Sequence, residues 1–306
     1  QTLDVSFVCY GAYDFKLPEG VNAIRDSSIQ ITARFLDLRR MRDGTEVTET
    51  GKLADLSRLE EHLAWQSLKY VDPTLDLPLQ QFLNPQKFIR LDAEESYTRG
   101  LLSPRGEQQQ KWLAQAAAID PHFAGPAFEL GKLALERKDY RQSLTWFGRI
   151  PAADPRYVEA KFRMGLAAYG VGDFTTAANH FREVGKTYPL NEVFNNLGAS
   201  EGQTNPRSAV DDFRRALDAD RSDTTYQFNT GIALLKSGSF EEAVTLLGRV
   251  AERDSDDREA ANLLDRARQH DANTGNSRIV PFRLKQNFDQ IAFRQLKAML
   301  QPKGSN

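Results

Sequence analysis

The chain has a single cysteine, Cys9, among its 306 residues, so it cannot form an intrachain disulfide. Its four histidines lie far apart, and none stands at metal-ligand spacing from Cys9 or from a pair of carboxylates. Lys and Arg number 40 against 42 Asp and Glu, which argues against a general nucleic-acid binder, since such proteins need an excess of cations. No apolar run approaches the ~20 residues of a membrane-spanning helix.

Catalytic motifs are equally scarce. The segment Gly170–Gly172 lacks the third glycine and the preceding strand of a dinucleotide-binding loop. The acidic run Asp254–Asp257 lacks the spaced ligands and distal Glu of a calcium loop, so we expect a solvated turn that caps a helix. Cys9 has no neighbouring base, and we expect a buried apolar side chain there. The sequence therefore predicts no enzyme, no cofactor and no metal.

What the chain does contain is an internal repeat. The pattern around Gly131 returns, type for type, 34 residues later around Gly165. Further copies surround Gly198 and Gly231, the third being one residue shorter in its turn, and a divergent earlier copy surrounds Gly100. Each copy predicts a helix, a turn and a second helix, so the repeat sets the fold of more than half the chain.

Glycine inside a helix costs about 1 kcal/mol relative to alanine, so its regular recurrence indicates close approach of two helices. Alanines of the second helices should supply the matching small surface, while bulky side chains should fill the space between neighbouring repeats: Phe147, Phe181, Phe213 and Leu247. Pro155 and Pro189 should end second helices. A solvating helix is expected from Asp257 to Gln269, because an open end of the array would expose an apolar face.

These features resemble the tetratricopeptide repeat (TPR) family, whose L-G…Y…A…F…P pattern has the same period. The resemblance covers residues 93–269 and implies a mainly α fold, an α-solenoid of about five helix pairs plus a capping helix over residues 93–270. It also implies a non-catalytic protein–protein interaction scaffold whose concave groove binds a protein or peptide segment.

The first 71 residues predict a small α+β domain instead. Alternating apolar residues predict strands over Val5–Tyr13 and Ile29–Arg39, and Gly44 marks a turn before an edge strand at Thr45–Thr50. Ser57–Glu60 forms a capping-box pattern that predicts the start of a helix reaching Tyr70. The apolar face of that helix should hold four side chains, Leu59, Leu63, Trp65 and Leu68.

Three segments of this part resemble the later half of a TolB amino-terminal-like or CsgG-like domain of bacterial envelope proteins: Val8–Tyr13, Ile31–Asp37 and Gly51–Ala64. The resemblance implies a location in the bacterial periplasm or at the outer-membrane periphery, with the cytoplasm as the alternative. It also leaves open a second function, in which this domain binds a small ligand or controls a partner enzyme and the repeats couple the two. The chain begins with Gln1 rather than Met, so we expect a mature or trimmed form.

Two segments flank the repeats. Residues 72–92 contain three prolines and predict an ordered or semi-rigid linker. Residues 271–306 predict a polar loop followed by an amphipathic helix with an apolar stripe: Phe288, Ile291, Ala292, Leu296 and Leu300. Three roles remain open for this helix, namely an extra cap, a ligand-like occupant of the groove, or a surface for self-association.

In the TPR family, the positions three before and one after the repeat glycine usually point into the groove. These positions and their neighbours give the candidate binding residues Phe128, Lys132, Phe162, Leu166, Tyr169, Asn195, Asn196, Phe228 and Ile232. The groove departs from the Lys/Asn/Arg carboxylate clamp, because only Lys132, Asn195 and Asn196 are polar. It is better suited to a peptide with hydrophobic anchors. The alternative is that the three phenylalanines belong to the core between repeats.

Overall fold

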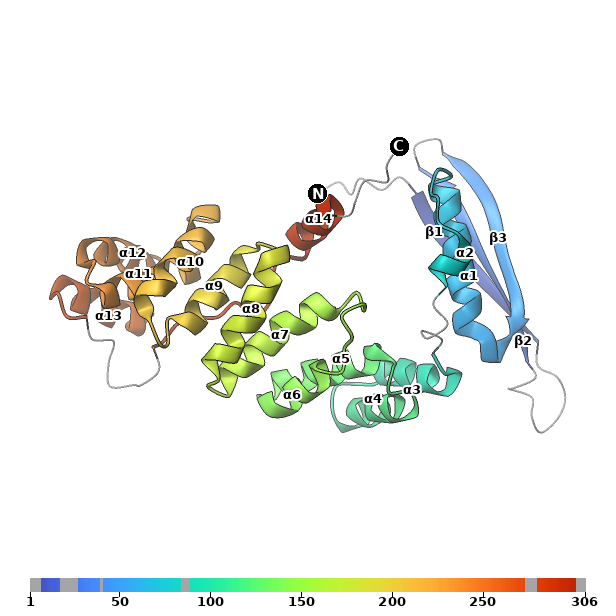
Figure 1. The fold of residues 1–306 in the computed structure, drawn as a ribbon, viewed down its shortest axis with the longest axis horizontal. Helices are drawn as coiled ribbons and strands as arrows, with labels where there is room; N and C mark the ends of the chain where they lie inside the picture. The colour runs from blue at the N-terminus through green and yellow to red at the C-terminus, as the bar shows by residue number, and fades with distance from the viewer. Residues whose placement is uncertain (1–6, 17–26, 39–40, 84–88, 273–279, 301–306) are drawn as a thin grey trace. The chain divides into compact units, whose positions relative to one another are not determined.

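The computed structural model describes residues 7–16, 27–38, 41–83, 89–272 and 280–300. The chain forms two compact units, Gln1–Pro126 and Ala127–Ser305 (Figure 1). The first unit holds the strands and the first helix pair, and the second holds the later repeats. Among the described residues, no helix combines the length and the apolar character needed to cross a membrane.

The first unit begins with a three-stranded antiparallel sheet in the order β1 (Phe7–Lys16), β2 (Ser28–Asp37) and β3 (Arg42–Lys52). Helix α1 (Leu56–Val71) packs on β2 and β3. The Tyr70 ring stacks on Phe35 with centroids 4.6 Å apart. The core of this part therefore lies between α1 and the centre of the sheet.

The turn predicted at Gly44 is wrong, because Gly44 lies inside β3 beside a shift in register opposite Phe35. The chain turns earlier, at Met41, which has a φ of 49°. Any side chain at Gly44 would collide with the ring of Tyr70. The glycine therefore makes room for the helix rather than for a turn.

The predicted capping box is also wrong. A short 3-10 helix, η1 (Leu53–Asp55), runs directly into α1, and Ser57 lies inside the first turn of that helix. Its hydroxyl donates to the carbonyl of Ile89 at 3.3 Å and to Glu94 at 3.4 Å instead of capping.

Two predictions of burial in this unit fail for one reason, which is that α1 covers only part of the sheet. Leu68, expected in the apolar face, is 43% exposed, and Tyr70 packs on the sheet instead. Cys9, expected to be buried, is exposed, as is all of β1 after Phe7.

Part of the predicted linker is ordered. It contains a short helix, α2 (Leu79–Phe82), and the indole of Trp65 donates to the carbonyl of Leu77 at 2.8 Å. Residues 84–88 of the linker lie outside the described residues. The first helix pair follows, with α3 (Leu91–Leu102) and α4 (Glu107–Ile119).

The remaining helices continue the repeat and confirm the predicted fold, five helix pairs and a final helix preceded by a small sheet. The pairs are α5 (Ala124–Glu136) with α6 (Tyr140–Phe147), α7 (Tyr157–Gly170) with α8 (Phe174–Thr187), α9 (Asn191–Glu201) with α10 (Pro206–Ala219), and α11 (Thr224–Ser237) with α12 (Phe240–Arg253). The final helix is α13 (Arg258–Arg268), whose N-cap is Asp257.

The repeat glycines do mark close approach of paired helices. A Cβ added at Gly165 would lie 2.6 Å from the ring of Phe181, and one added at Gly198 would lie 3.0 Å from Phe213. The bulky side chains thus pack within each pair, beneath the glycine, and not only between neighbouring repeats. Two of these rings, Phe181 and Phe213, are completely buried.

The two prolines behave differently. Pro189 follows the end of α8 at Thr187, as predicted. Pro155 does not end α6, because that helix already stops at Phe147, and the proline lies in the turn that precedes α7.

The chain beyond α13 returns to the repeats. Most of the predicted polar loop, residues 273–279, lies outside the described residues. Residues 280–289 are described and carry no regular secondary structure, and they lead into α14 (Gln290–Leu300). In Figure 1 the orange-red trace of this part runs past α9 and α8 before it reaches α14.

Candidate functional site

The candidate site is a groove formed by the first helices of three repeats, α7, α9 and α11. We call residues Val280–Phe288, which lie in this groove, the C-terminal segment. Val280, Phe282 and Phe288 of the segment are all less than 8% exposed. The groove is therefore filled by the protein's own chain, which has no helix or strand here.

Two buried asparagines hold the main chain of this segment. The Asn229 side chain donates to the carbonyl oxygen of Arg283 at 2.7 Å and accepts from its N–H at 2.8 Å. Asn196 does the same for Lys285, at 2.8 Å in both directions. Both asparagines are completely buried, and a buried amide without such partners would be costly.

A third asparagine, Asn195, joins the two pairs. Its amide donates to the carbonyl of Arg283 at 3.0 Å and to the Asn196 side chain at 3.1 Å, and its oxygen accepts from Asn229 at 2.8 Å. We call these three residues the asparagine ladder. Its bonds to the segment go to main-chain groups, so they do not depend on which side chains the bound segment carries.

The ladder follows the repeat. Asn196 and Asn229 each stand two residues before their repeat glycine, and so does Arg163, whose guanidinium lies 3.3 Å from the Asn287 side chain. Equivalent positions of α11, α9 and α7 thus contact segment residues 283, 285 and 287. Successive repeats therefore contact every second residue of the segment.

Aromatic contacts anchor both ends of the segment. The ring of Phe282 packs on Phe213 with centroids 5.0 Å apart. The ring of Phe288 meets Phe162 edge-on at 5.1 Å. Edge-on pairs of this kind stabilise a contact beyond the area that they bury.

Acidic side chains face the two basic residues of the segment. Arg283 lies 2.7 Å from Asp257 and 3.4 Å from Glu259, with its guanidinium 3.4 Å from the centroid of the Phe228 ring. The hydrogen bond from Arg283 lowers the pKa of Asp257, an effect that burial partly opposes. The positive charge of Arg283 is thus matched both by carboxylates and by an aromatic face.

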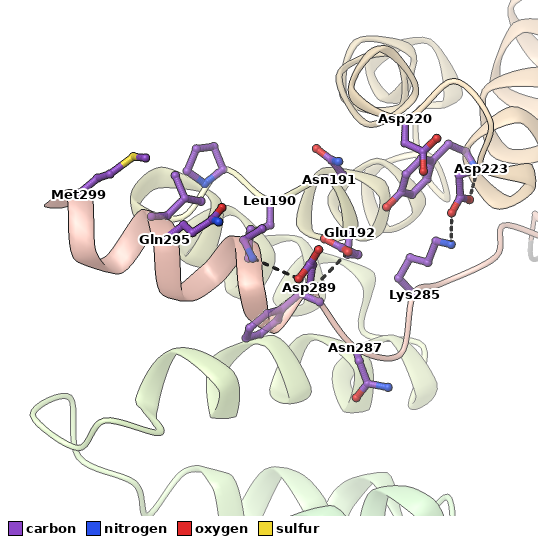
Figure 2. A pocket seen from close by; sticks show the side chains of 15 residues that line it. Leu190, Asn191, Glu192, Asp220, Asp223, Lys285, Asn287, Asp289, Gln295 and Met299 are labelled. Carbon is purple, nitrogen blue, oxygen red and sulfur yellow. Dashed lines mark hydrogen bonds and ion pairs between the residues drawn. The ribbon is translucent and has the colours of Figure 1, made fainter. Parts of the chain in front are cut away.

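Lys285 is held in the same way. Its ammonium lies 2.5 Å from Asp223 and 4.9 Å from the centroid of the Tyr226 ring. Burial, reinforced by three nearby carboxylates, raises the pKa of Tyr226. Figure 2 shows Lys285 pointing at Asp223, with Asp289 next to Glu192.

Polar contacts close the segment at its two ends. Gln203 donates to the carbonyl of Val280 and accepts from its N–H, both at 2.8 Å. Gln203 also donates to the hydroxyl of Tyr169 at 2.6 Å, and burial raises the pKa of that tyrosine to about 12. At the other end, Glu192 accepts from the N–H of Asp289 at 3.1 Å, and burial raises the pKa of this carboxyl.

Two open cavities border the segment. One of about 660 Å³ lies between the loop before α9, Lys285 and α14, and Figure 2 shows its lining. Another of about 740 Å³ is bordered by Tyr169, Phe282 and Leu284. The segment therefore fills the middle of the groove and leaves space on both sides of it.

Most of the predicted binding residues surround this segment. Asn195 and Asn196 bond to its backbone, Phe162 and Phe228 contact its side chains, and three others border it or share a buried cluster with it: Leu166, Tyr169 and Ile232. Phe162 and Phe228 are at most 1% exposed, so they belong to the core as well as to the groove.

The remaining two candidates have other neighbours. Phe128 packs on Phe147 with centroids 5.7 Å apart, within its own repeat. Lys132 pairs with Glu129 at 2.8 Å. The structure therefore places the contacts of these two residues within the second helix pair, α5 and α6, rather than beside the segment.

The sequence analysis missed Asn229, Gln203, Asp223 and Asp257. A signal was present for the first of these, because Asn229 occupies the same repeat position as Asn196. The expected groove positions were three before and one after the glycine; Asn195 contacts the backbone from the first of these, but the paired main-chain bonds come from the position two before the glycine.

The predicted apolar stripe of the tail is partly wrong. Phe288 precedes α14 and is buried in the groove, whereas Ile291 and Leu300 are 59% and 55% exposed. The stripe consists instead of Ala292, Leu296 and Phe293, which pack on the repeats, with the Phe293 ring 4.7 Å from that of Tyr188.

The groove contains hydrogen-bonding, charged and aromatic groups, which suit the binding of a peptide. Among the described residues there is no group of three or more His, Cys, Asp or Glu side chains that could hold a metal ion.

The described fold is mainly α, with helix pairs in an arrangement like that of tetratricopeptide repeats. Profiles described as "Tetratricopeptide repeat" match residues 201–259 and 159–191. A search of curated proteins found no match. The comparisons do not show the TolB-like or CsgG-like resemblance of the first part, which stays a prediction.

Several solved structures are similar to the chain. YrrB, described as a TPR protein with an unusual peptide-binding site, is 17% identical, with a TM-score of 0.44, over 61% of this chain and 97% of YrrB. MamA from Desulfovibrio magneticus RS-1 is 18% identical, with a TM-score of 0.48, over 54% and 95%. PilF of Pseudomonas aeruginosa is 18% identical, with a TM-score of 0.47, over 68% and 97%. At these values the likeness concerns the fold alone.

Proposed function

We propose that this protein is a non-catalytic interaction scaffold whose groove binds an extended segment of a partner protein. The observation that carries the proposal is the pair of asparagines, Asn196 and Asn229, that each bond to both main-chain groups of one residue. Such bonds give affinity for any extended chain, while pockets for alternate side chains give specificity.

The occupant seen in the groove supports this proposal. The C-terminal segment lies there in the conformation of a bound peptide, with alternating contacts to successive repeats. Its main-chain groups at residues 283 and 285 would otherwise need water, and the asparagines would lose their partners. A location in the bacterial envelope remains a prediction beside this proposal.

The test uses the full chain with its own segment released. The substitutions Arg283→Glu and Lys285→Glu place like charges opposite Asp257 and Asp223 and should free the groove, which hydrogen exchange at residues 283 and 285 can verify. A fluorescent peptide with the sequence of residues 280–289, VPFRLKQNFD, should then bind in trans, as measured by polarisation.

Binding should disappear when Asn196→Ala and Asn229→Ala are added to the released variant. The matched control is Asn179→Ala, an exposed asparagine on α8. A released groove that binds no peptide, or that binds equally well without the two asparagines, contradicts the proposal.

A further inference from the structure

The side chains of the C-terminal segment make contacts that the asparagine ladder does not require. Between Phe282 and Phe288 the segment reads Phe-Arg-Leu-Lys-Gln-Asn-Phe. Both aromatic and both basic side chains have dedicated neighbours in the groove, so the groove is shaped for a particular pattern as well as for an extended backbone.

The acidic wall is made by the starts of two helices. One oxygen of Asp223 accepts from the N–H groups of Thr225 and Tyr226, which caps α11, and its other oxygen faces Lys285. Asp257 caps α13 through Ala260 and pairs with Arg283. Capping explains why an Asp stands at each site, but it does not explain why both carboxylates face cations two residues apart on one segment.

Aromatic rings also favour basic side chains in the bound segment. The ring of Phe228 lies under the guanidinium of Arg283, and the ring of Tyr226 lies near the ammonium of Lys285. Both rings come from the same helix, α11. An acidic wall backed by aromatic faces favours a basic ligand.

The socket for the Phe282 ring exists because residue 202 is a glycine. A Cβ added at Gly202 would lie 2.6 Å from the Phe282 ring, which also packs on Phe213. The second aromatic, Phe288, packs on Phe162. The two sockets lie six residues apart along the segment, on either side of the acidic wall.

We propose that the groove exchanges its own C-terminal segment for an extended segment of another protein that carries two basic residues, two positions apart, between two aromatic anchors. This inference rests on the proposed function and names the partner's chemistry. The internal segment and the partner segment use the same atoms, so they cannot bind together, and the internal copy competes with the partner.

Three labelled peptides test the selection on the full-length variant released by Arg283→Glu and Lys285→Glu. The first has the native sequence of residues 280–289, the second carries glutamate at both basic positions, and the third carries alanine at both aromatic positions. Since charge-assisted bonds and buried aromatics dominate such sites, the second and third should bind at least about tenfold more weakly than the first.

Two further proteins sharpen the test. The unaltered full chain should bind the native peptide more weakly than the released variant, because its tethered segment competes at an effective concentration on the order of millimolar. The substitution Glu259→Lys, added to the released variant, removes one acidic partner of Arg283 and keeps the helix cap Asp257. It should reduce the difference in affinity between the native peptide and the glutamate peptide.

The outcomes separate the two proposals. Equal binding of all three peptides, still dependent on Asn196 and Asn229, overturns this inference and leaves the proposed function standing. If none of the three peptides binds although the C-terminal segment has left the groove, both proposals are overturned. If the unaltered protein forms a dimer in which the two copies exchange C-terminal segments, the occupant of the groove is a second copy of this chain. That result overturns the partner proposed here.

Discussion

Removal of the Asn229 side chain should release the C-terminal segment while leaving the repeats folded. In Asn229→Ala, the segment loses the acceptor for the N–H of Arg283 at 2.8 Å and the donor to its carbonyl at 2.7 Å, and Asn195 loses a donor at 2.8 Å. Only the two bonds to Arg283 differ between the bound and the released segment, and at roughly 1 kcal/mol each they correspond to about 2 kcal/mol, or about thirtyfold in the opening equilibrium.

Hydrogen exchange followed by mass spectrometry can measure this release at residues 280–288. The exchange of the Arg283 and Lys285 amides should accelerate about thirtyfold, whereas α7 and α8 keep their protection. Asn179→Ala serves as the control, because this side chain on α8 is exposed and accepts a hydrogen bond from Arg182. Exchange at 283 and 285 that changes by less than threefold refutes the reasoning.

Three further predictions concern other parts of the chain. Gly165→Ala should lower the free energy of unfolding by about 1–3 kcal/mol, because its Cβ would lie 2.6 Å from Phe181. Gly248→Ala should raise the free energy of unfolding by up to about 1 kcal/mol, because the nearest neighbour of its Cβ would lie 4.0 Å away. Urea titration of the two variants measures both effects. Burial, aided by the charge of Glu201, raises the pKa of Asp212 to about 6, so ionisation of the folded protein opposes folding as pH rises from 4 to 6. Asp212→Asn should therefore be more stable than the parent at pH 7.5, by about 2 kcal/mol, and equal to it at pH 4; thermal melts that shift alike at both values contradict this. Cys9 should react with a thiol reagent in the native protein as fast as in urea, and protection in the native state would contradict its exposure.

The repeat architecture could be predicted because its cause is local and periodic. Gly165 and Gly198 must stand opposite Phe181 and Phe213, so the spacing of these residues is visible in one sequence. The start of α1 could not be predicted in the same way. Ser57 fits a capping pattern, yet the preceding 3-10 turn and the bonds to Ile89 and Glu94 decide its place.

The site was only partly predictable for a physical reason. A repeat pattern shows which helix face is apolar, and it led to Asn195, Asn196 and Phe162. The occupant of the groove makes much of its contact through its main chain, which leaves no trace in the residue types of residues 280–288. Its pairing with helices 54 to 124 residues earlier in the chain likewise depends on the tertiary structure.

The most direct test of the account is an NMR measurement on full-length protein with labelled phenylalanine rings. The account predicts nuclear Overhauser effects between Phe288 and Phe162, whose ring centroids lie 5.1 Å apart, and between Phe282 and Phe213, at 5.0 Å. Rings of Phe282 and Phe288 that give no cross-peaks to the repeats, and that have the sharp lines of a free tail, would contradict an occupied groove.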